Sequence, residues 1–158
     1  MKHGSMIENK GLLMKELTIK FKFDGVSTSS DEISAFEKKY DIIFPEYLKA
    51  FLLTYGGTTT EEHKYLDQYT VNDFLPLQEN RNASIEMILP VVRDEEEGAG
   101  RNDLIPFATD PGGRSFYVSI GESDNGCIYY DVIGMVSAEP VRKIANSFEE
   151  FINSLRKD

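Results

Sequence analysis

Carboxylates are the commonest reactive groups in this sequence, which has 27 Asp and Glu residues against 17 Lys and Arg. Asp103, Asp110 and Asp131 could converge on a divalent cation, since hard oxygen ligands suit Ca²⁺ and Mg²⁺. However, Asp110 opens the turn Asp110-Pro111-Gly112-Gly113, where an Asp side chain accepts backbone N–H bonds. We expect the other two to face water. The sequence therefore predicts no metal site and no cofactor.

Groups that could act as a nucleophile or a general base are few. His3 lies before Met6 and is assigned no function, and His63 lies in a polar stretch that favours a solvated surface side chain. Cys127 has no adjacent cation to lower its pKa, which favours a buried, inert thiol. The segment Gly121–Gly126 lacks the second glycine of a G-x-S-x-G motif and is predicted to be a hairpin turn. We predict no catalytic residue and a protein that is not an enzyme.

The net charge of −10 limits the classes of partner. Nucleic acids and anionic membranes are polyanions and should be repelled, whereas a basic protein should be attracted. The alternative is that the acidic excess only keeps the domain soluble.

A single cysteine allows no internal disulfide, no apolar run is long enough to span a membrane, and the first residues lack the apolar core of a signal peptide. We expect a cytoplasmic protein, and its oligomeric state stays open.

The length of 158 residues favours one domain, which we place at residues 18–158 after an N-terminal extension, 1–17. Its first half should contain a strand over 18–23, helices near 30–40 and 45–55, and a loop over Thr58–Asp67. The first helix has a capping box at Ser29 and Glu32, and the second ends at Gly56-Gly57. Val71–Leu77 is a weaker strand candidate. Ser84–Leu89 is a short helix that Pro90 should end or kink.

The second half changes to the alternation typical of strands. Segments 104–108, 116–120 and 128–132 predict an antiparallel meander, and a helix over 147–156 begins at the cap residue Ser147. Helices thus flank a run of strands, which predicts an α+β fold. The expected core contains Phe36, Leu48, Phe51, Leu52, Phe107, Phe116, Val118, Ile128, Phe148 and Phe151.

Three motifs resemble the SUKH superfamily, which includes the Smi/Knr-type regulators of cell-wall assembly. The first combines Ile33–Glu37 with Phe44–Leu52 and Gly56-Gly57, the second is Leu104–Gly113, and the third is Ser147–Ile152. The positions that match the family motifs, for which we expect structural roles, are Phe36, Glu37, Pro45, Tyr47, Phe51, Gly56, Gly57, Pro106, Phe107, Asp110, Gly112, Gly113, Phe148 and Phe151. Relatives often carry Asp or Asn where this chain has Arg114, and a Trp followed by His where it has Tyr129-Tyr130-Asp131.

The resemblance implies a sheet flanked by helices and a role as a protein-binding module. Many bacterial members resemble immunity proteins that neutralise a partner toxin. The alternative is a regulatory or scaffolding protein with no toxin partner, and a toxin gene next to this one would favour the first role. A basic toxin domain could be bound by the following acids and tyrosines: Asp94, Glu95, Glu96, Glu97, Asp103, Tyr65, Tyr69 and Tyr129. The alternative for the tyrosines is partial burial in the core.

Overall fold

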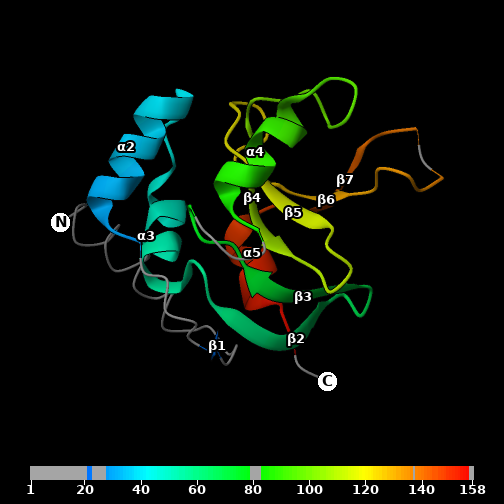
Figure 1. The fold of residues 1–158 in the computed structure, drawn as a ribbon. Helices are drawn as coiled ribbons and strands as arrows, with labels where there is room; N and C mark the ends of the chain where they lie inside the picture. Colours follow the sequence, from blue (N-terminus) through cyan, green and yellow to red (C-terminus); the bar gives the residue numbers. More distant parts are fainter. Residues whose placement is uncertain (1–20, 23–27, 79–82, 137, 157–158) are drawn as a thin grey trace.

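The fold is α+β, with one antiparallel sheet flanked by helices, as the sequence predicts (Figure 1). A computed structural model describes residues 21–22, 28–78, 83–136 and 138–156, with the side chains of 21–22 and 59–62 excluded. Most of the predicted strand 18–23 and the predicted domain boundary at residue 18 lie outside this part of the chain. None of the helices within it is long and apolar enough to cross a membrane.

The sheet is a meander in which each strand pairs with the next one along the chain. Within the described residues its strands are β1 (Phe21–Lys22), β2 (Thr59–Tyr65), β3 (Tyr69–Phe74), β4 (Leu104–Thr109), β5 (Ser115–Ser119), β6 (Ile128–Asp131) and β7 (Val141–Ala145). In the part of the chain that the structure describes, the strands from β4 to β7 and the pair β2 and β3 follow each other without a helix between them, whereas two helices lie between β1 and β2 and one lies between β3 and β4. The predicted meander at 104–133 supplies three neighbouring strands, β4, β5 and β6.

The helices that the structure describes are α2 (Ser30–Tyr40), α3 (Glu46–Tyr55), α4 (Ile85–Arg93) and α5 (Phe148–Asn153). Helices α2 and α5 begin after the predicted cap residues Ser29 and Ser147, and α3 and α4 begin within one residue of their predicted starts. The capping box of α2 is complete, since the Glu32 N–H donates to Ser29 Oγ at 3.1 Å and the Ser29 N–H donates to Glu32 Oε1 at 2.8 Å. Pro45 is the N-cap of α3, and Gly57 follows this helix with φ +82°, a conformation that favours glycine.

The sequence predicted that Pro90 would end or kink helix α4, which continues through Pro90 to Arg93 and so does not end there. Its start at Ser84 fits the prediction, because the Ser84 side chain accepts from the Met87 N–H at 3.1 Å. Pro90 removes one hydrogen bond of the helix. The buried side chains Ile85, Leu89 and Val92 anchor the helix on both sides of that position. Tertiary packing of one helix face therefore outweighs the local preference of proline.

Two strands escaped prediction. The stretch Thr58–Asp67, predicted as a loop, contains β2, and the charged strand β7 was not predicted at all. In the turn after β2, Leu66 and Asp67 both have positive φ, as in a type I′ turn, but lack the Asn-Gly signature of that turn. Strand β7 carries charged residues on one edge of the sheet, where they discourage pairing with another chain.

Aromatic rings from helices and strands form the core. All ten predicted core residues are buried. Phe148 and Phe151 on α5 contact Phe107 of β4, with ring centroids 5.1 and 5.8 Å apart. Phe51 of α3 lies 5.2 Å from Phe148, also between centroids. Figure 1 shows α5 beside the sheet. Through Phe148 this short helix packs against both α3 and β4.

Candidate functional site

The acidic residues Asp94, Glu95, Glu96 and Glu97 form an exposed loop after α4, which we call the acidic loop. Asp94 Oδ1 accepts from the backbone N–H groups of Glu96 and Glu97, each at 2.8 Å. Hydrogen bonds from Glu97 and then Glu96 lower the pKa of Asp94, so this carboxyl stays ionised. Asp94 therefore holds the turn that presents the three glutamates to solvent.

The acidic loop is also fastened to the end of α4. The Gly98 N–H donates to the Asp94 carbonyl at 3.0 Å, and the Gly100 N–H to the Val92 carbonyl at 3.0 Å. A Cβ at position 98 would overlap the Val91 carbonyl oxygen, so only glycine fits this close approach of loop and helix. The four carboxylates therefore extend from α4 in a defined arrangement.

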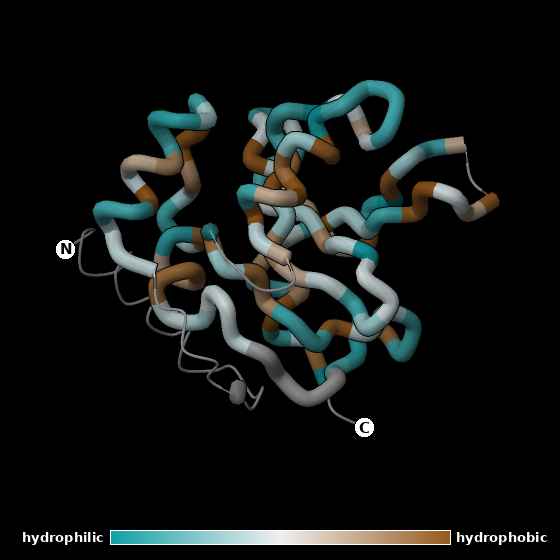
Figure 2. Tube along the Cα trace, in the orientation of Figure 1, coloured by the Kyte–Doolittle hydropathy of each residue, from teal (hydrophilic) through white to brown (hydrophobic). Residues whose placement is uncertain are grey.

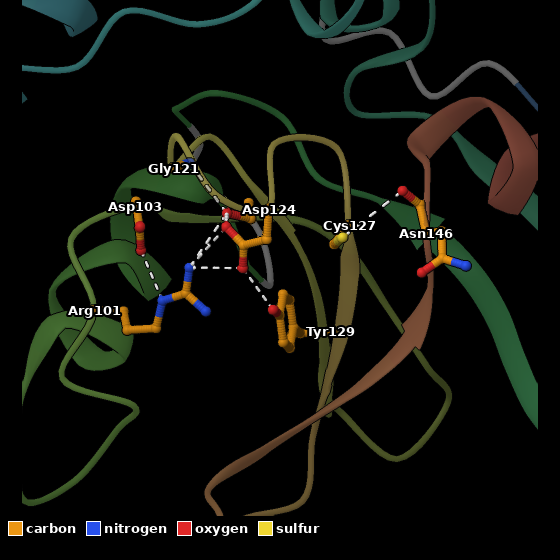
Figure 3. A network of polar contacts seen from close by, with 8 residues as sticks. Arg101, Asp103, Gly121, Asp124, Cys127, Tyr129 and Asn146 are labelled. Carbon is orange, nitrogen blue, oxygen red and sulfur yellow. Dashed lines mark hydrogen bonds and ion pairs between the residues drawn. The ribbon is translucent and has the colours of Figure 1, made fainter.

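A network of polar contacts begins at Arg101, after the acidic loop in the chain, and connects this arginine to the turn between β5 and β6 (Figure 3). Arg101 Nε donates to Asp103 Oδ1 at 2.8 Å, and Arg101 Nη2 lies 3.1 Å from Asp124 Oδ2. Tyr129 donates its hydroxyl to Asp124, and its ring lies 5.2 Å from the Arg101 guanidinium. The hydroxyl of the buried Ser119 also donates to Asp124. Asp124 is thus the centre of the network.

The charges in this network are stabilised at neutral pH. Burial alone would raise the pKa of Asp124, but hydrogen bonds from Ser119, Tyr129 and Arg101 hold it below its ordinary value. The bond to Asp103 contributes most to raising the pKa of Arg101. Burial and then the bond to Asp124 raise the pKa of Tyr129. These groups keep one protonation state near neutral pH, which suits a structural role better than acid–base catalysis.

We expect Asp124→Asn to lower the free energy of unfolding by about 1–3 kcal/mol at neutral pH, since it weakens hydrogen bonds to partly buried groups. Because the pKa of Asp124 is lowered on folding, its contribution is present above the unfolded pKa and is lost as the pH falls through the folded one. Urea unfolding should show a smaller difference from wild type near about pH 3. The control Asp103→Asn, with a more exposed side chain, should cost less. Equal losses at both pH values would contradict this role.

Two of the tyrosines expected to contact a partner lie in the core. Tyr65 and Tyr69 are 5% and 7% exposed. The ring of Tyr65 lies 4.7 Å from that of Phe151, and the ring of Tyr69 lies 5.0 Å from that of Tyr130. Neither offers much area to another protein. Tyr129 is half-buried, with its hydroxyl and one ring face engaged in the network.

The prediction of a solvated His63 was wrong, because the residue is 3% exposed. It lies on β2 opposite Val71, and the alternation of the strand turns it inward together with Tyr65. The prediction of a buried Cys127 is confirmed, and its Sγ lies 3.7 Å from the Asn146 carbonyl oxygen (Figure 3).

The three aspartates considered as cation ligands, Asp103, Asp110 and Asp131, contact other residues of this chain and do not share a cation site. Asp103 binds Arg101, whereas Asp110 accepts from the Arg114 N–H at 2.8 Å and from the Tyr130 hydroxyl at 2.6 Å. Asp131 lies 3.6 Å from the Arg114 guanidinium. Within the described ranges, no three His, Cys, Asp or Glu side chains are grouped to hold a metal ion.

The residues of the family motifs mostly organise the fold. Glu37 accepts from the Phe44 N–H at 2.8 Å and lies 3.7 Å from Lys49 Nζ, so it fastens the connection between α2 and α3. Tyr47 packs on Phe148 with centroids 5.4 Å apart, and burial raises its pKa to about 12. The motif phenylalanines are all buried. These motif positions therefore stabilise the fold of the domain, and contacts with a partner would involve other residues on its surface.

Sequence reasoning missed two arginines that position loops. Arg101 is the cation of the network, and its pairing with Asp124 joins segments that no local pattern connects. Arg114 donates to the carbonyls of Asp131 and Ile133 at 3.3 and 2.8 Å, so it supports the start of the connection between β6 and β7. The signal in the sequence for Arg101 was the nearby Asp103, and for Arg114 it was the departure from the residue that relatives often carry at this position.

Comparison with protein families gives one match over most of the chain. A model described as the SMI1/KNR4 family (SUKH-1) matches residues 27–154, which include every element from α2 to α5. No curated protein matches the chain.

Proposed function

Since the chain belongs to the SMI1/KNR4 family (SUKH-1), we propose that it is a non-enzymatic protein-binding module, an immunity protein that neutralises a partner toxin by binding it. The resemblance of many bacterial members to immunity proteins motivates the role. The observation that carries the binding mode is the acidic loop, whose four carboxylates are exposed on a backbone held by Asp94.

The partner we propose is a basic toxin domain. Proteins that act on nucleic acids carry positive surfaces, because they must neutralise phosphates. Four neighbouring carboxylates on a chain of net charge −10 imitate such a polyanion and can cover that surface. Opposite charges also raise the rate of encounter. This binding blocks the toxin without any chemical step.

Several side chains that could take part in catalysis are buried or bound by other residues of the fold. His63 and Cys127 are buried, and Asp124 is bound by Arg101 and Tyr129. The proposed mechanism assigns none of them a reaction, and it requires neither metal nor cofactor. A toxin active inside the cell would have to be met there, so we place the protein in the cytoplasm.

Co-expression tests the proposal. The genes next to the one for this chain are expressed singly under an inducible promoter, with and without the chain. We expect one of them to arrest growth alone and to be tolerated when the chain is present. The tolerated toxin should co-purify with the chain, because neutralisation acts by binding. Growth arrest that the chain does not relieve would contradict the proposal, and so would the absence of any toxic neighbour.

A further inference from the structure

Helix α4 has a second apolar face that the core does not use. Ile85, Leu89 and Val92 are buried, whereas Met87 and Val91 are 55% and 50% exposed. Residues four apart lie on the same side of a helix, so Met87 and Val91 form one patch. The exposed Pro90 lies between them in sequence and next to them in space. These three residues are called the outer face of α4 below.

Both ends of α4 are fastened to α2, which keeps the outer face in place. Glu86 accepts from Lys39 Nζ at 2.9 Å and from the Tyr40 hydroxyl at 2.7 Å. These two hydrogen bonds, that of Lys39 first, lower the pKa of Glu86. Near the other end, Arg93 Nη2 donates to the Tyr40 carbonyl at 3.2 Å. A partner therefore meets a preformed surface, which reduces the entropy lost on binding.

The outer face of α4 continues into the acidic loop. Met87 and Val91 are spaced i and i+4 on the helix, and Asp94, three residues after Val91, is the C-cap at which the acidic loop begins. Figure 2 shows the hydrophobic colours of α4 giving way to hydrophilic colours in the loop that follows it. The surface thus has an apolar area with carboxylates at one end. Protein interfaces commonly have such an apolar centre and a polar rim.

We infer that the outer face of α4 and the acidic loop together bind a segment of the partner in which apolar side chains lie next to Lys or Arg. The inference rests on the proposed function and specifies its partner. Charge complementarity selects this occupant, since a basic neighbour of the apolar contact would lie against the four carboxylates. A second copy of this chain would bring the same acids together if the patch met itself.

Synthetic peptides and amide chemical shifts test the inference. The first peptide carries two leucines among lysines, the second has serines in place of the leucines, and the third has glutamines in place of the lysines. At low ionic strength the first should shift the amide signals of residues 87 to 97, with the exception of Pro90. The second should bind there about three- to tenfold more weakly, because it loses the apolar contact. The third should lose most of its binding at low salt.

Variants of the chain separate this inference from the proposed function. In Met87→Ser/Val91→Ser the first peptide should bind no better than the second. The control Leu66→Asn removes an exposed leucine (65% exposed) from the turn after β2, at a position of positive φ that suits asparagine, and should change nothing. If the first two peptides bind wild type equally, the apolar contact is refuted while docking on the acidic loop stands. If neither peptide shifts the amide signals of the acidic loop, the apolar contact and docking on the acidic loop are both refuted.

Discussion

Phe51→Ala should lower the free energy of unfolding by about 3–5 kcal/mol, the usual cost of removing a fully enclosed aromatic ring. Phe51 is 1% exposed, and its ring lies 5.1 Å from that of Phe74 and 5.2 Å from that of Phe148. These neighbours belong to β3 and α5, so the deletion would open a cavity between three elements. Urea unfolding of both proteins measures the loss.

Leu53→Ala is the matched control for this prediction. Leu53 lies on the same helix and is 43% exposed, so its removal should cost less than about 1 kcal/mol. A similar loss in both variants would show that α3 is sensitive to any deletion. No loss in Phe51→Ala would remove this ring from the centre of the core.

The periodicity of apolar residues was enough to predict most elements that carry a buried face. Leu48, Phe51, Leu52 and Tyr55 have helical spacing, and they belong to α3 in the structure. Strand β7 was missed because its charged residues show no alternation, and its identity depends on pairing with β6. Pro90 does not end α4, because the packing of Ile85, Leu89 and Val92 outweighs the local preference of proline, and the sequence alone does not show that packing.

The candidate site was predictable only where it is local. Four consecutive acids predict their own exposure, and the structure agrees. Because β2 was predicted as a loop, His63 was expected to be exposed and Tyr65 to be available to a partner. In the strand, both side chains point inward and are buried. The contact of Arg101 with Asp124 joins residues 23 positions apart, and no spacing rule predicts such a pair.

Reversal of Glu95, Glu96 and Glu97 to lysine should slow association with the toxin domain by about 10- to 100-fold at low ionic strength. Asp94 is left in place because it accepts the two hydrogen bonds that hold the acidic loop. The glutamate side chains are exposed, so the fold should survive and the dissociation rate should change less. Stopped-flow mixing with the toxin domain found by co-expression measures both rates.

The association rate constant over a range of ionic strength tests the central claim most directly. The control reverses three exposed acids on other elements, Asp31, Glu122 and Glu149, and changes the net charge by the same amount. We predict that wild type associates fast at low salt, that the loop variant is slow, and that the control stays close to wild type. The difference should shrink as salt screens the charges. Equal rates for wild type and the loop variant at low salt, or equal slowing in the control, would contradict docking through the acidic loop.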